Sequence, residues 1–424
     1  MNYALLIAFH FPPLHGSSGL QRTLGFARHL HAGHWAPLIL SAHPRAYTAM
    51  STDLVGAVPG GVPVKRAFAL DTAKHLALHG RYFDWMALPD RWVSWLLGAI
   101  PSGLAMIRRY RPRLIWSTYP IATAHIIAWA LHRISGIPWV ADFRDPMVER
   151  DPRTGEMAPP NRTLRRARLW VERLCVKHTS RIVLCTQGAK RICAERYPEV
   201  PDTHWVIIPN GYEESDFNGC VTTPEASPKH KGPLVLLHSG IIYPTPDRDP
   251  GALFDAVATL RNAGRISSER LRIVLRATAY DGLFRPMIEA HGIEDIVSLA
   301  PAIPYRDALK EMCEVDGLLV FQGYTSNPAI PAKVYEYLRT GKPILAMIDA
   351  EGDTAALLRQ LGIGIQVPLD DPHRIAEGLC EFLDQIERGT APRAEIRTVE
   401  EFSRARGAQA LARLFDDVTG AGAR

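Results

Sequence analysis

The sequence has few of the features that mark secreted or membrane-spanning proteins. Its first residues carry no basic region, and the apolar run Ala4–Phe9 is too short for a signal peptide. The uncharged stretch Trp92–Ile107 has 16 residues and contains Pro101, so it is short for a membrane-spanning helix. We therefore expect a cytoplasmic protein whose N-terminal apolar run forms a buried β-strand.

Cysteine is also scarce, and its spacing argues against two further classes. The six cysteines include no Cys-x-x-Cys pair and have no histidine at metal-ligand spacing. We therefore expect buried thiols in a reducing compartment, without a disulfide framework or a bound metal. No recognised nucleic-acid motif accompanies the basic residues, so nucleic acid is not expected as a partner. The cysteines are Cys175, Cys185, Cys193, Cys220, Cys313 and Cys380.

The composition that remains is that of a soluble globular protein. Apolar residues make up 47% and charged residues 22% of the 424 residues, and a chain of this length suits two domains of about 200 residues. Residues 1–212 hold 26 Lys or Arg and 13 Asp or Glu, whereas the remainder holds 23 and 31. This asymmetry predicts an anionic partner for the first half, either an anionic membrane surface or a phosphate-bearing acceptor.

Apolar runs alternate with helical periodicity along the first half. Such alternation predicts a parallel, doubly wound sheet. We expect strands at 3–10, 36–41, 114–117, 139–142, 181–185 and 205–208, and helices at 20–32, 93–110, 121–135, 161–178 and 187–196.

The same alternation restarts after the polar stretch 222–232, which we interpret as a linker. A last amphipathic helix over 400–418 has no domain of its own to complete, so we expect it to pack back on the first domain. The predicted fold class is α/β, with two Rossmann-like domains, 1–212 and 213–399, whose strand ends line a shared cleft. The expected strands of the second domain are 234–238, 271–277, 297–299, 317–321 and 343–347, and its helices 251–263, 282–291, 305–312, 331–340 and 354–361.

The segment 327–347 (NPAIPAKVYEYLRTGKPILAM) carries the most specific chemistry. Pro331 suits the first turn of a helix, and the free N–H groups of such a turn attract phosphate. Lys333 would add a full charge there, and Glu336, one turn later on the same face, would accept hydrogen bonds from a ribose diol. The alternative is a surface Glu–Lys pair on an amphipathic helix.

The string Pro331–Leu345 is similar to the P-x-K-x-x-E-Y-x-x-x-G-K-P-I-L block of the bacterial GT4-type glycosyltransferases, which have the GT-B fold. This resemblance implies that Glu336 holds the ribose of a nucleotide-sugar donor and Lys333 meets its diphosphate. Many members have a further glutamate eight residues before the one that corresponds to Glu336, and this chain has Pro328 at that position. Sugar recognition would then use other groups, among them Asn327.

Two segments of the first domain extend the resemblance. FPPLHGSSGLQRTLGFARHL (11–30) is similar to the family's Gly-rich donor loop, in which Gly16 and Gly19 would let the backbone approach a phosphate. A turn that merely needs glycine is the alternative. WVADFRDPM (139–147) resembles a D-x-R-D-P-W block. Asp145 is our candidate for a catalytic or acceptor-orienting residue, with Asp142 and Arg144 in support, and a purely structural ion pair is the alternative.

Two more segments lie near or after the domain boundary. VIIPNGYEESDF (206–217) matches the family's I-P-N-G crossover, which is mainly structural. LLHSGIIYPTPDRDPGAL (236–253) is similar to its second phosphate loop, with Ser239, Gly240 and Arg248 as donor-binding candidates. Arg276, at the end of a predicted strand, is another.

Three further features of the sequence each have a plainer alternative interpretation. Many relatives place a histidine near the donor sugar, and His10 and His125 are the candidates, although a structural histidine is the better interpretation. The string 247–249 (Asp-Arg-Asp) has the spacing of a metal motif, but we interpret it as part of the phosphate loop. The stretch 92–107 is either a buried helix or, with the Arg-rich helix 162–173, an interfacial helix on the inner membrane face.

Together these observations predict a glycosyltransferase that needs no cofactor or metal. The donor would be a nucleotide diphosphate sugar, with uridine diphosphate as the first choice of nucleotide and guanosine diphosphate as the second. The acceptor would be a sugar or a lipid-linked sugar in cell-surface polysaccharide or glycolipid synthesis, and retention of configuration rests on the resemblance alone. A nucleotide-sugar epimerase or hydrolase of the same fold, and a catalytically idle module, are the alternatives.

Overall fold

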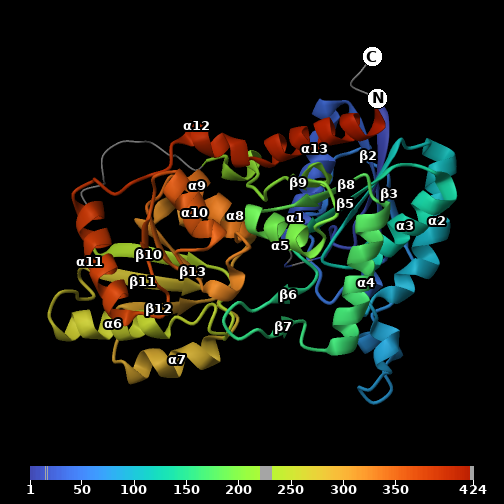
Figure 1. Cartoon of the computed structure of the whole chain (residues 1–424). Helices are drawn as coiled ribbons and strands as arrows, with labels where there is room; N and C mark the ends of the chain where they lie inside the picture. Colours follow the sequence, from blue (N-terminus) through green and yellow to red (C-terminus); the bar gives the residue numbers. More distant parts are fainter. Residues whose placement is uncertain (15, 17, 220–231, 421–424) are drawn as a thin grey trace. The chain divides into compact units, whose positions relative to one another are not determined.

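The computed structural model describes residues 1–14, 16, 18–219 and 232–420 of the chain. The chain folds into two compact units (Figure 1). Unit 1 comprises residues 1–210 and the C-terminal segment that begins at Arg404, and unit 2 comprises Gly211–Ser403. Most of the stretch 222–232 lies outside the described residues, so its role as a linker stays a prediction.

Unit 1 is built on a parallel sheet whose described strands follow the order β3-β2-β1-β4-β5-β8-β9. Alternate residues of β1 join different apolar clusters, since Leu5 and Ile7 belong to one and Ala4 and Leu6 to the other. The central strands are therefore covered on both faces, which is why they read as continuous apolar runs. The strands are β1 (Asn2–Ile7), β2 (Trp35–Ala42), β3 (Val64–Ala67), β4 (Leu114–Thr118), β5 (Trp139–Arg144), β8 (Arg181–Leu184) and β9 (Trp205–Ile207).

The helices of unit 1 lie close to their predicted positions. Helix α2 packs closely against α3. A Cβ atom on Gly103 of α2 would come within 2.5 Å of a methyl group of Leu131 of α3, so glycine is needed at this contact. This packing is what the buried-helix interpretation of 92–107 requires. No helix in the described residues is both long enough and apolar enough to cross a bilayer. The helices are α1 (Ser18–His29), α2 (Leu96–Tyr110), α3 (Thr123–Ser135), α4 (Arg162–His178), α5 (Gln187–Arg196) and α13 (Arg404–Thr419).

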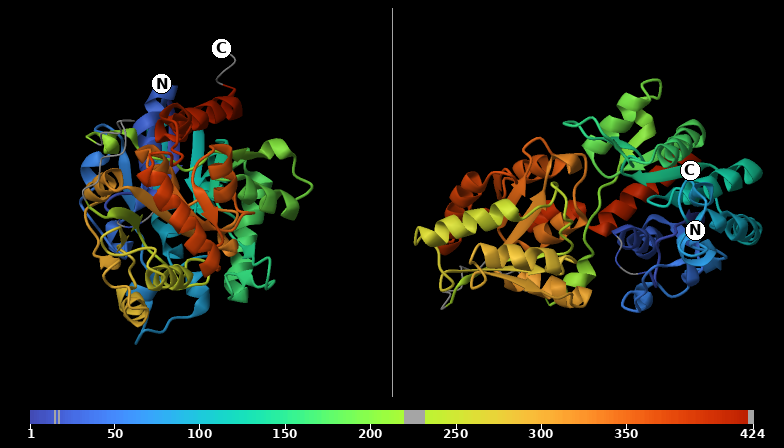
Figure 2. Two further views of the ribbon diagram at one scale, coloured as in Figure 1. Left: turned by 90° about the vertical axis from the view of Figure 1, so that its left-hand side faces the viewer. Right: turned by 90° about the horizontal axis from the view of Figure 1, so that it is seen from below.

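Unit 2 repeats this plan with described strands in the order β12-β11-β10-β13-β14-β15, all parallel. Leu236 and Leu237 of β10 belong to different apolar clusters, and helices lie on both faces of the sheet (Figure 2). The strands are β10 (Leu234–Ser239), β11 (Leu271–Arg276), β12 (Val297–Ala300), β13 (Gly317–Gln322), β14 (Ile344–Ile348) and β15 (Ile365–Val367), and the helices are α6 (Gly251–Asn262), α7 (Asp281–Ala290), α8 (Tyr305–Glu314), α9 (Ala332–Thr340), α10 (Asp353–Gln360), α11 (Pro372–Glu387) and α12 (Ile396–Val399).

The predicted fold class, two Rossmann-like parallel-sheet domains in one chain, is confirmed. The structure adds elements that the periodicity analysis did not predict. They are β3, β15, α11, α12 and an antiparallel hairpin of β6 (Glu149–Arg150) and β7 (Met157–Ala158).

The C-terminal helix α13 completes the core of unit 1. The Trp35 indole N–H donates to Asp416 Oδ1 at 3.0 Å, and its ring meets Phe415 edge to face at 5.3 Å. Gly33 allows this approach, since a Cβ atom there would lie 2.4 Å from the Ala412 Cβ. The absence of a side chain at Gly33 therefore sets how closely α13 packs.

We predict that Gly33→Ala destabilises unit 1. The added methyl overpacks the contact with Ala412, which should cost about 1–3 kcal/mol and lower the thermal midpoint by roughly 2–4 °C per kcal/mol. All nine tryptophans lie between Trp35 and Trp205, so intrinsic tryptophan fluorescence reports the unfolding of unit 1 alone. Gly60→Ala is the matched control, since a Cβ atom there meets nothing within 4 Å. Equal midpoints for the two variants would contradict the prediction.

Candidate functional site

Each sheet has one point where its strand order reverses, between β1 and β4 in unit 1 and between β10 and β13 in unit 2. Ligands of open α/β sheets bind at such a point, beyond the carboxyl ends of the strands. In unit 2, β10 ends there with Ser239, followed by Gly240, and β13 ends with Gln322. The candidate groups of unit 2 gather around these strand ends.

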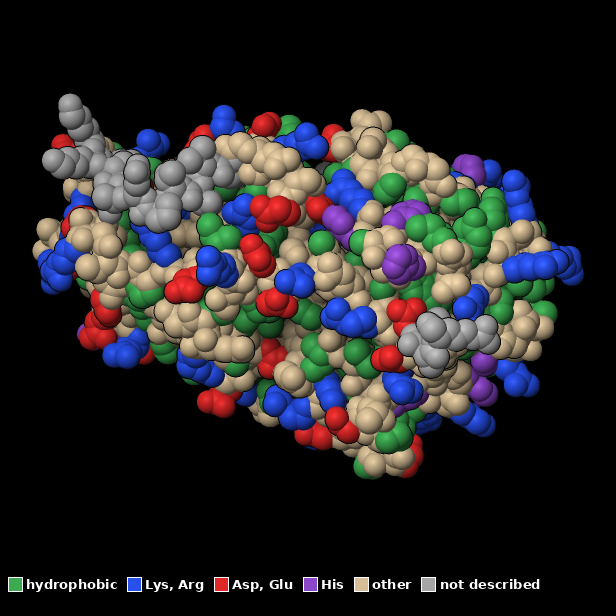
Figure 3. Space-filling view, turned by 90° about the horizontal axis from the view of Figure 1, so that it is seen from above, with side chains coloured by type: hydrophobic (Ala, Val, Ile, Leu, Met, Phe, Trp, Pro, Cys, Tyr) green, Lys and Arg blue, Asp and Glu red, His purple; other side chains and the backbone are tan. Residues whose placement is uncertain are grey.

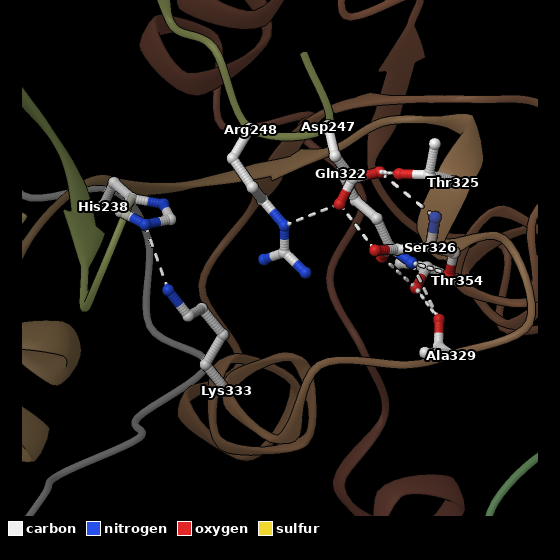
Figure 4. Close-up of polar contacts among 9 residues, drawn as sticks. All are labelled: His238, Asp247, Arg248, Gln322, Thr325, Ser326, Ala329, Lys333 and Thr354. Atoms are coloured by element: carbon white, nitrogen blue, oxygen red, sulfur yellow. Dashed lines mark hydrogen bonds and ion pairs between the residues drawn. The ribbon is translucent and has the colours of Figure 1, made fainter. Parts of the chain in front are cut away.

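His238, near the end of β10, holds Lys333 from the first turn of α9 (Figure 4). The ring Nδ1 lies 2.9 Å from the carbonyl oxygen of Leu319, and this oxygen can only accept a hydrogen bond. The proton therefore sits on Nδ1, and Nε2 accepts from the Lys333 ammonium at 3.0 Å. Burial, followed by the charge of Lys333, holds the pKa of His238 well below its usual value, so the ring stays neutral.

Gly240 lets the chain pass close to this ammonium. Its φ of +120° lies in the region that favours glycine, and a Cβ atom would come within 2.9 Å of Lys333 Nζ. Burial, and then the charge of Arg248, lower the pKa of Lys333 to about 7, while Glu336 acts in the opposite direction. Lys333 and Arg248, two basic groups held close together in a partly buried place, are therefore a candidate anion site.

Arg248 supplies the second positive charge. Its Nε atom donates to Asp247 Oδ2 at 3.3 Å, and among the described residues its two Nη atoms have no hydrogen-bond partner. Figure 4 shows the Arg248 and Lys333 side chains extending toward the same space from opposite sides. Asp247 is itself held by the Thr325 hydroxyl at 2.7 Å and the Ser326 N–H at 3.1 Å. This loop therefore directs the Arg248 side chain toward the anion site.

Glu336 and Tyr337 connect α9 to neighbouring elements. The Glu336 side chain is almost buried and accepts a hydrogen bond of 2.7 Å from the Tyr305 hydroxyl. The Tyr337 hydroxyl accepts from the Ser239 N–H at 2.9 Å. Ser239, Gly240, Arg248, Lys333 and Glu336 are thus connected through α9 and the loop after β10.

The structure gives Arg276 and Asn327 other contacts. Arg276 forms an ion pair with Glu311, with one contact of 2.6 Å, and donates to the Pro301 carbonyl at 2.7 Å. The Asn327 backbone carbonyl accepts from the Asp353 N–H at 2.8 Å. These contacts stabilise local structure, and donor binding by either residue stays a prediction.

In unit 1, the predicted candidate Asp142 belongs to a buried ion pair. Arg22 from α1 donates to both carboxylate oxygens, Nε to Oδ2 at 3.0 Å and Nη2 to Oδ1 at 2.9 Å. The Thr118 hydroxyl adds a hydrogen bond of 2.8 Å, and Arg22 Nη1 donates to the Pro209 carbonyl at 3.0 Å. Burial opposes the charge of Arg22, but Asp142 outweighs it and raises the pKa of Arg22. The pair holds together four segments at the end of the sheet.

Arg144 and Asp145 follow an irregularity in β5. The pairing of β5 with β8 shifts its register between Asp142 and Arg144, and Arg144 has a φ of +65°. Burial raises the pKa of the partly buried Asp145, and the positive charges of Arg144 and Arg22 only partly offset it. Asp145 therefore binds a proton more readily than an ordinary aspartate.

Tyr119, after β4, interacts electrostatically with Asp145, and His10, after β1, interacts electrostatically with Arg144. Burial raises the pKa of Tyr119 to about 12, and Asp145 contributes in the same direction. Burial, and then the charge of Arg144, lower the pKa of His10 to about 4. The ends of β1, β4 and β5 thus bring together polar groups, at the point where the strand order reverses.

The remaining predicted residues of unit 1 have clear structural positions. Gly16 is exposed with a φ of +78° before α1, and Gly19 lies in the first turn of α1, where its carbonyl accepts from the Thr23 hydroxyl. His125 is fully buried, with Nδ1 2.7 Å from the Ser117 hydroxyl, and burial lowers its pKa to about 3. These contacts agree with a structural role for His125, and phosphate binding by the two glycines stays a prediction.

Acidic residues at metal-motif spacing have other partners. Asp247 binds the loop that follows β13, and Asp249 Oδ1 accepts from the Gly251 N–H at 2.9 Å at the start of α6. In the described part of the chain, no group of three or more His, Cys, Asp or Glu side chains is placed to hold a metal ion. Independence from a metal stays a prediction.

Several site residues were missed by the sequence analysis. They share one property, which is that their partners lie far away in the chain. A signal existed for His238, the first polar residue after an apolar run in the strand LVLLHS. The missed residues are Arg22, Tyr119, His238, Asp247 (as a positioning group), Tyr305 and the Tyr337 hydroxyl.

The comparison with protein families matches a segment that lies in unit 1 except for its last residue. Residues 23–211 match the model of the glycosyl transferase 4-like domain. The resemblance to GT4-type glycosyltransferases that the motifs predict is thereby confirmed over this segment. No curated protein sequence matches the chain.

Solved structures share the fold over nearly the whole chain. HepE from Anabaena, solved with UDP and glucose, superposes with a TM-score of 0.65 at 15% identity, covering 98% of this chain and 100% of its own. Sucrose-phosphate synthase from Thermosynechococcus elongatus gives 0.63 at 14%, covering 99% and 100%. A UDP-GlcNAc 2-epimerase from Neisseria meningitidis, bound to UDP-GlcNAc, gives 0.52 at 10%, covering 98% and 99%. The fold is thus GT-B, and at these identities the likeness shows the fold alone.

The anion site predicts pH-dependent binding of inorganic pyrophosphate. Lys333, with a pKa of about 7 in the free protein, must be protonated to bind an anion well. Affinity should therefore be highest below pH 7 and fall as the pH rises above it, by up to about tenfold per unit. Lys333→Met should weaken binding by roughly 10–100-fold at pH 6.5 and lose this part of the pH slope.

Calorimetric titration between pH 6.5 and 8.5 tests this prediction. The ratio of wild-type to Lys333→Met affinities removes the ligand's own ionisation. Lys310→Met is the control, since Lys310 is exposed on α8 and pairs with Glu314 at 3.7 Å. A ratio that stays constant with pH would show that Lys333 does not take up a proton on binding.

The two aspartates of β5 and its following loop should respond oppositely to neutralisation. Asp142→Asn leaves the buried Arg22 charge without its counter-ion and should cost about 3–5 kcal/mol. Asp145→Asn should leave the stability unchanged or raise it, because burial already disfavours the charged form of Asp145. Urea unfolding followed by tryptophan fluorescence would measure both. A larger loss for Asp145→Asn than for Asp142→Asn would contradict this division of roles.

Proposed function

We propose that the protein is a glycosyltransferase that moves a sugar from a nucleotide diphosphate sugar to an acceptor hydroxyl. Unit 2 would bind the donor and unit 1 the acceptor. The observation that carries the proposal is the anion site of Lys333, Arg248 and His238 at the reversal point of the unit 2 sheet. The glycosyl transferase 4-like match of unit 1 supports the same reaction class.

The proposed role of the anion site is to stabilise the leaving group. As the bond between the sugar C1 and the diphosphate oxygen breaks, negative charge grows on the nucleotide diphosphate. Protonated Lys333 and the Nη atoms of Arg248 would bind that charge, assisted by the positive end of the α9 helix dipole. Glu336, held by Tyr305, would accept hydrogen bonds from the ribose hydroxyls.

Asp145 is proposed to act on the acceptor. The acceptor oxygen forms the new bond to C1 and loses its proton. A carboxylate with a raised pKa suits a group that receives this proton or orients the hydroxyl. Arg144 would hold a negatively charged part of the acceptor, and Asp142 would act only through its ion pair with Arg22.

Finer features of the proposal rest on the motif resemblance. We propose a uridine diphosphate hexose as donor, retention of configuration, and a reaction without a metal or other cofactor. A lipid-linked sugar acceptor would suit the excess of basic residues in the first half of the sequence. The protein would then work in cell-surface polysaccharide or glycolipid synthesis on the inner membrane face.

Nucleotide binding by unit 2 is the first test. A ligand at about 100 times its dissociation constant should stabilise the protein by roughly 2.7 kcal/mol. We expect one of UDP, GDP, ADP and TDP to raise the calorimetric midpoint of unit 2 selectively, and Glu336→Gln to abolish this shift. Glu314→Gln, at an exposed position on α8, is the control. The absence of a shift with any nucleotide would contradict the donor site and favour a catalytically idle module.

The reaction class needs a second measurement with the donor that this screen identifies. A glycosyltransferase should release nucleotide slowly alone and much faster with an acceptor, and Asp145→Asn should reduce only the acceptor-dependent release. A nucleotide-sugar epimerase of the same fold would instead change the free donor without any acceptor. Formation of an epimer or rapid acceptor-free release would contradict glycosyl transfer.

A further inference from the structure

A protruding loop of unit 1 exposes large apolar side chains. It lies between β3 and α2 and extends away from the sheet in Figure 1. All eight residues of 78–85 are exposed. Four of them, Leu78 (75%), Tyr82 (37%), Phe83 (71%) and Trp85 (69%), form what we name the aromatic tip. A group of large, exposed apolar side chains is typical of an interaction surface.

The structure holds the base of this loop in place. The Thr72 hydroxyl donates to the Met86 carbonyl at 2.9 Å, and the Thr72 N–H donates to the Arg91 carbonyl at 2.8 Å. Arg91 also forms an ion pair of 3.0 Å with the buried Asp71. The two ends of the loop are therefore joined, so the loop is presented from a defined base.

The turn at the end of the loop is also formed. Leu78 and Arg81 exchange backbone hydrogen bonds of 2.8 and 3.0 Å across His79 and Gly80, whose φ values are +51° and +75°. Two successive residues with positive φ define a tight hairpin turn. The loop thus has its own fold, yet it leaves the side chains of Leu78, Phe83 and Trp85 mostly exposed.

Charge around the aromatic tip indicates the kind of partner. Lys74 and Arg81 are exposed, whereas of the nearby acidic residues only Asp84 is exposed. Asp71 and Asp90 are buried, where Asp90 accepts from the first residue of α3. The exposed charge of the loop is therefore positive. Elsewhere, on the face in Figure 3, Lys and Arg side chains are scattered and form no continuous basic surface.

We propose that the aromatic tip inserts into the headgroup region of an anionic lipid bilayer. Trp and Tyr side chains favour the membrane–water interface, Leu and Phe contribute apolar area, and Lys74 and Arg81 would meet lipid phosphates. The surface differs from α2, whose apolar side packs against α3. It deepens the proposed function, on which it rests for its purpose, because a lipid-linked acceptor lies at a membrane surface.

Vesicle sedimentation of the full chain tests the proposal. The probe is phosphatidylcholine vesicles with about one third phosphatidylserine, in about 0.15 M salt. We expect wild-type protein to bind, and Phe83→Ser/Trp85→Ser to bind about tenfold or more weakly. Lys74→Gln/Arg81→Gln should lose most of the preference for phosphatidylserine over pure phosphatidylcholine. Leu97→Ser is the control, since Leu97 is 74% exposed on α2, outside the loop.

Two outcomes would overturn the proposal. One is wild-type protein that ignores the vesicles, or a Phe83→Ser/Trp85→Ser variant that binds them equally well. The other is self-association, seen by analytical ultracentrifugation without lipid and lost in that variant, which would make a second copy the occupant. The nucleotide-induced shift of unit 2 should persist in every loop variant, so failure of lipid binding is distinguishable from failure of the donor site.

Discussion

The contact between Lys333 and His238 constrains most of what surrounds it in unit 2. This contact requires that the proton of the His238 ring sit on Nδ1, so that Nε2 can accept from Lys333. The Leu319 carbonyl of β13, which accepts from Nδ1, ensures this. The contact also requires that the chain after β10 pass without a side chain, which Gly240 provides. The register of β10 against β13, with Leu237 opposite Leu318, determines where along β13 the His238 ring lies. A shift by one residue would turn the ring to the opposite face of the sheet.

A buried ion pair has the corresponding role in unit 1. Arg22 and Asp142 connect α1 to β5, and their remaining hydrogen bonds reach β4 and the segment after β9. A buried ion pair is stable only when its remaining polar atoms also form hydrogen bonds. Here Arg22 donates to the Pro209 carbonyl, and Asp142 accepts from the Thr118 hydroxyl. Directly after Asp142 the strand changes register, and the pKa of Asp145 is raised by burial although the charges of Arg144 and Arg22 act against it. Two aspartates of one short motif thus have different environments, since Asp142 is ion-paired with Arg22 and Asp145 has a pKa raised by burial.

Much of the fold could be predicted from the sequence because long apolar and amphipathic runs encode it locally. The elements that were not predicted include short ones, such as β3 with four residues and β15 with three, and also the 16-residue helix α11. The site was predicted where local signals exist, as for Lys333 after Pro331, and missed where partners are remote. His238 is 95 residues from Lys333, and Arg22 is 120 residues from Asp142. Only the order and register of the strands bring such pairs together.

The position of Asp145 depends on elements that follow it in the chain. Beyond Asp145, the Met147 N–H donates to the buried Glu172 of α4 at 3.2 Å. Arg196 of α5 donates both to Glu172 and to the Val148 carbonyl, each at 2.5 Å. Because Glu172 is fully buried, its hydrogen bonds and those of Arg196 connect the segment after Asp145 to α4 and α5. In the Arg-rich helix α4, the buried carboxylate of Glu172 therefore helps to position Asp145, the residue proposed to act on the acceptor. This role does not depend on what the exposed arginines of α4 bind.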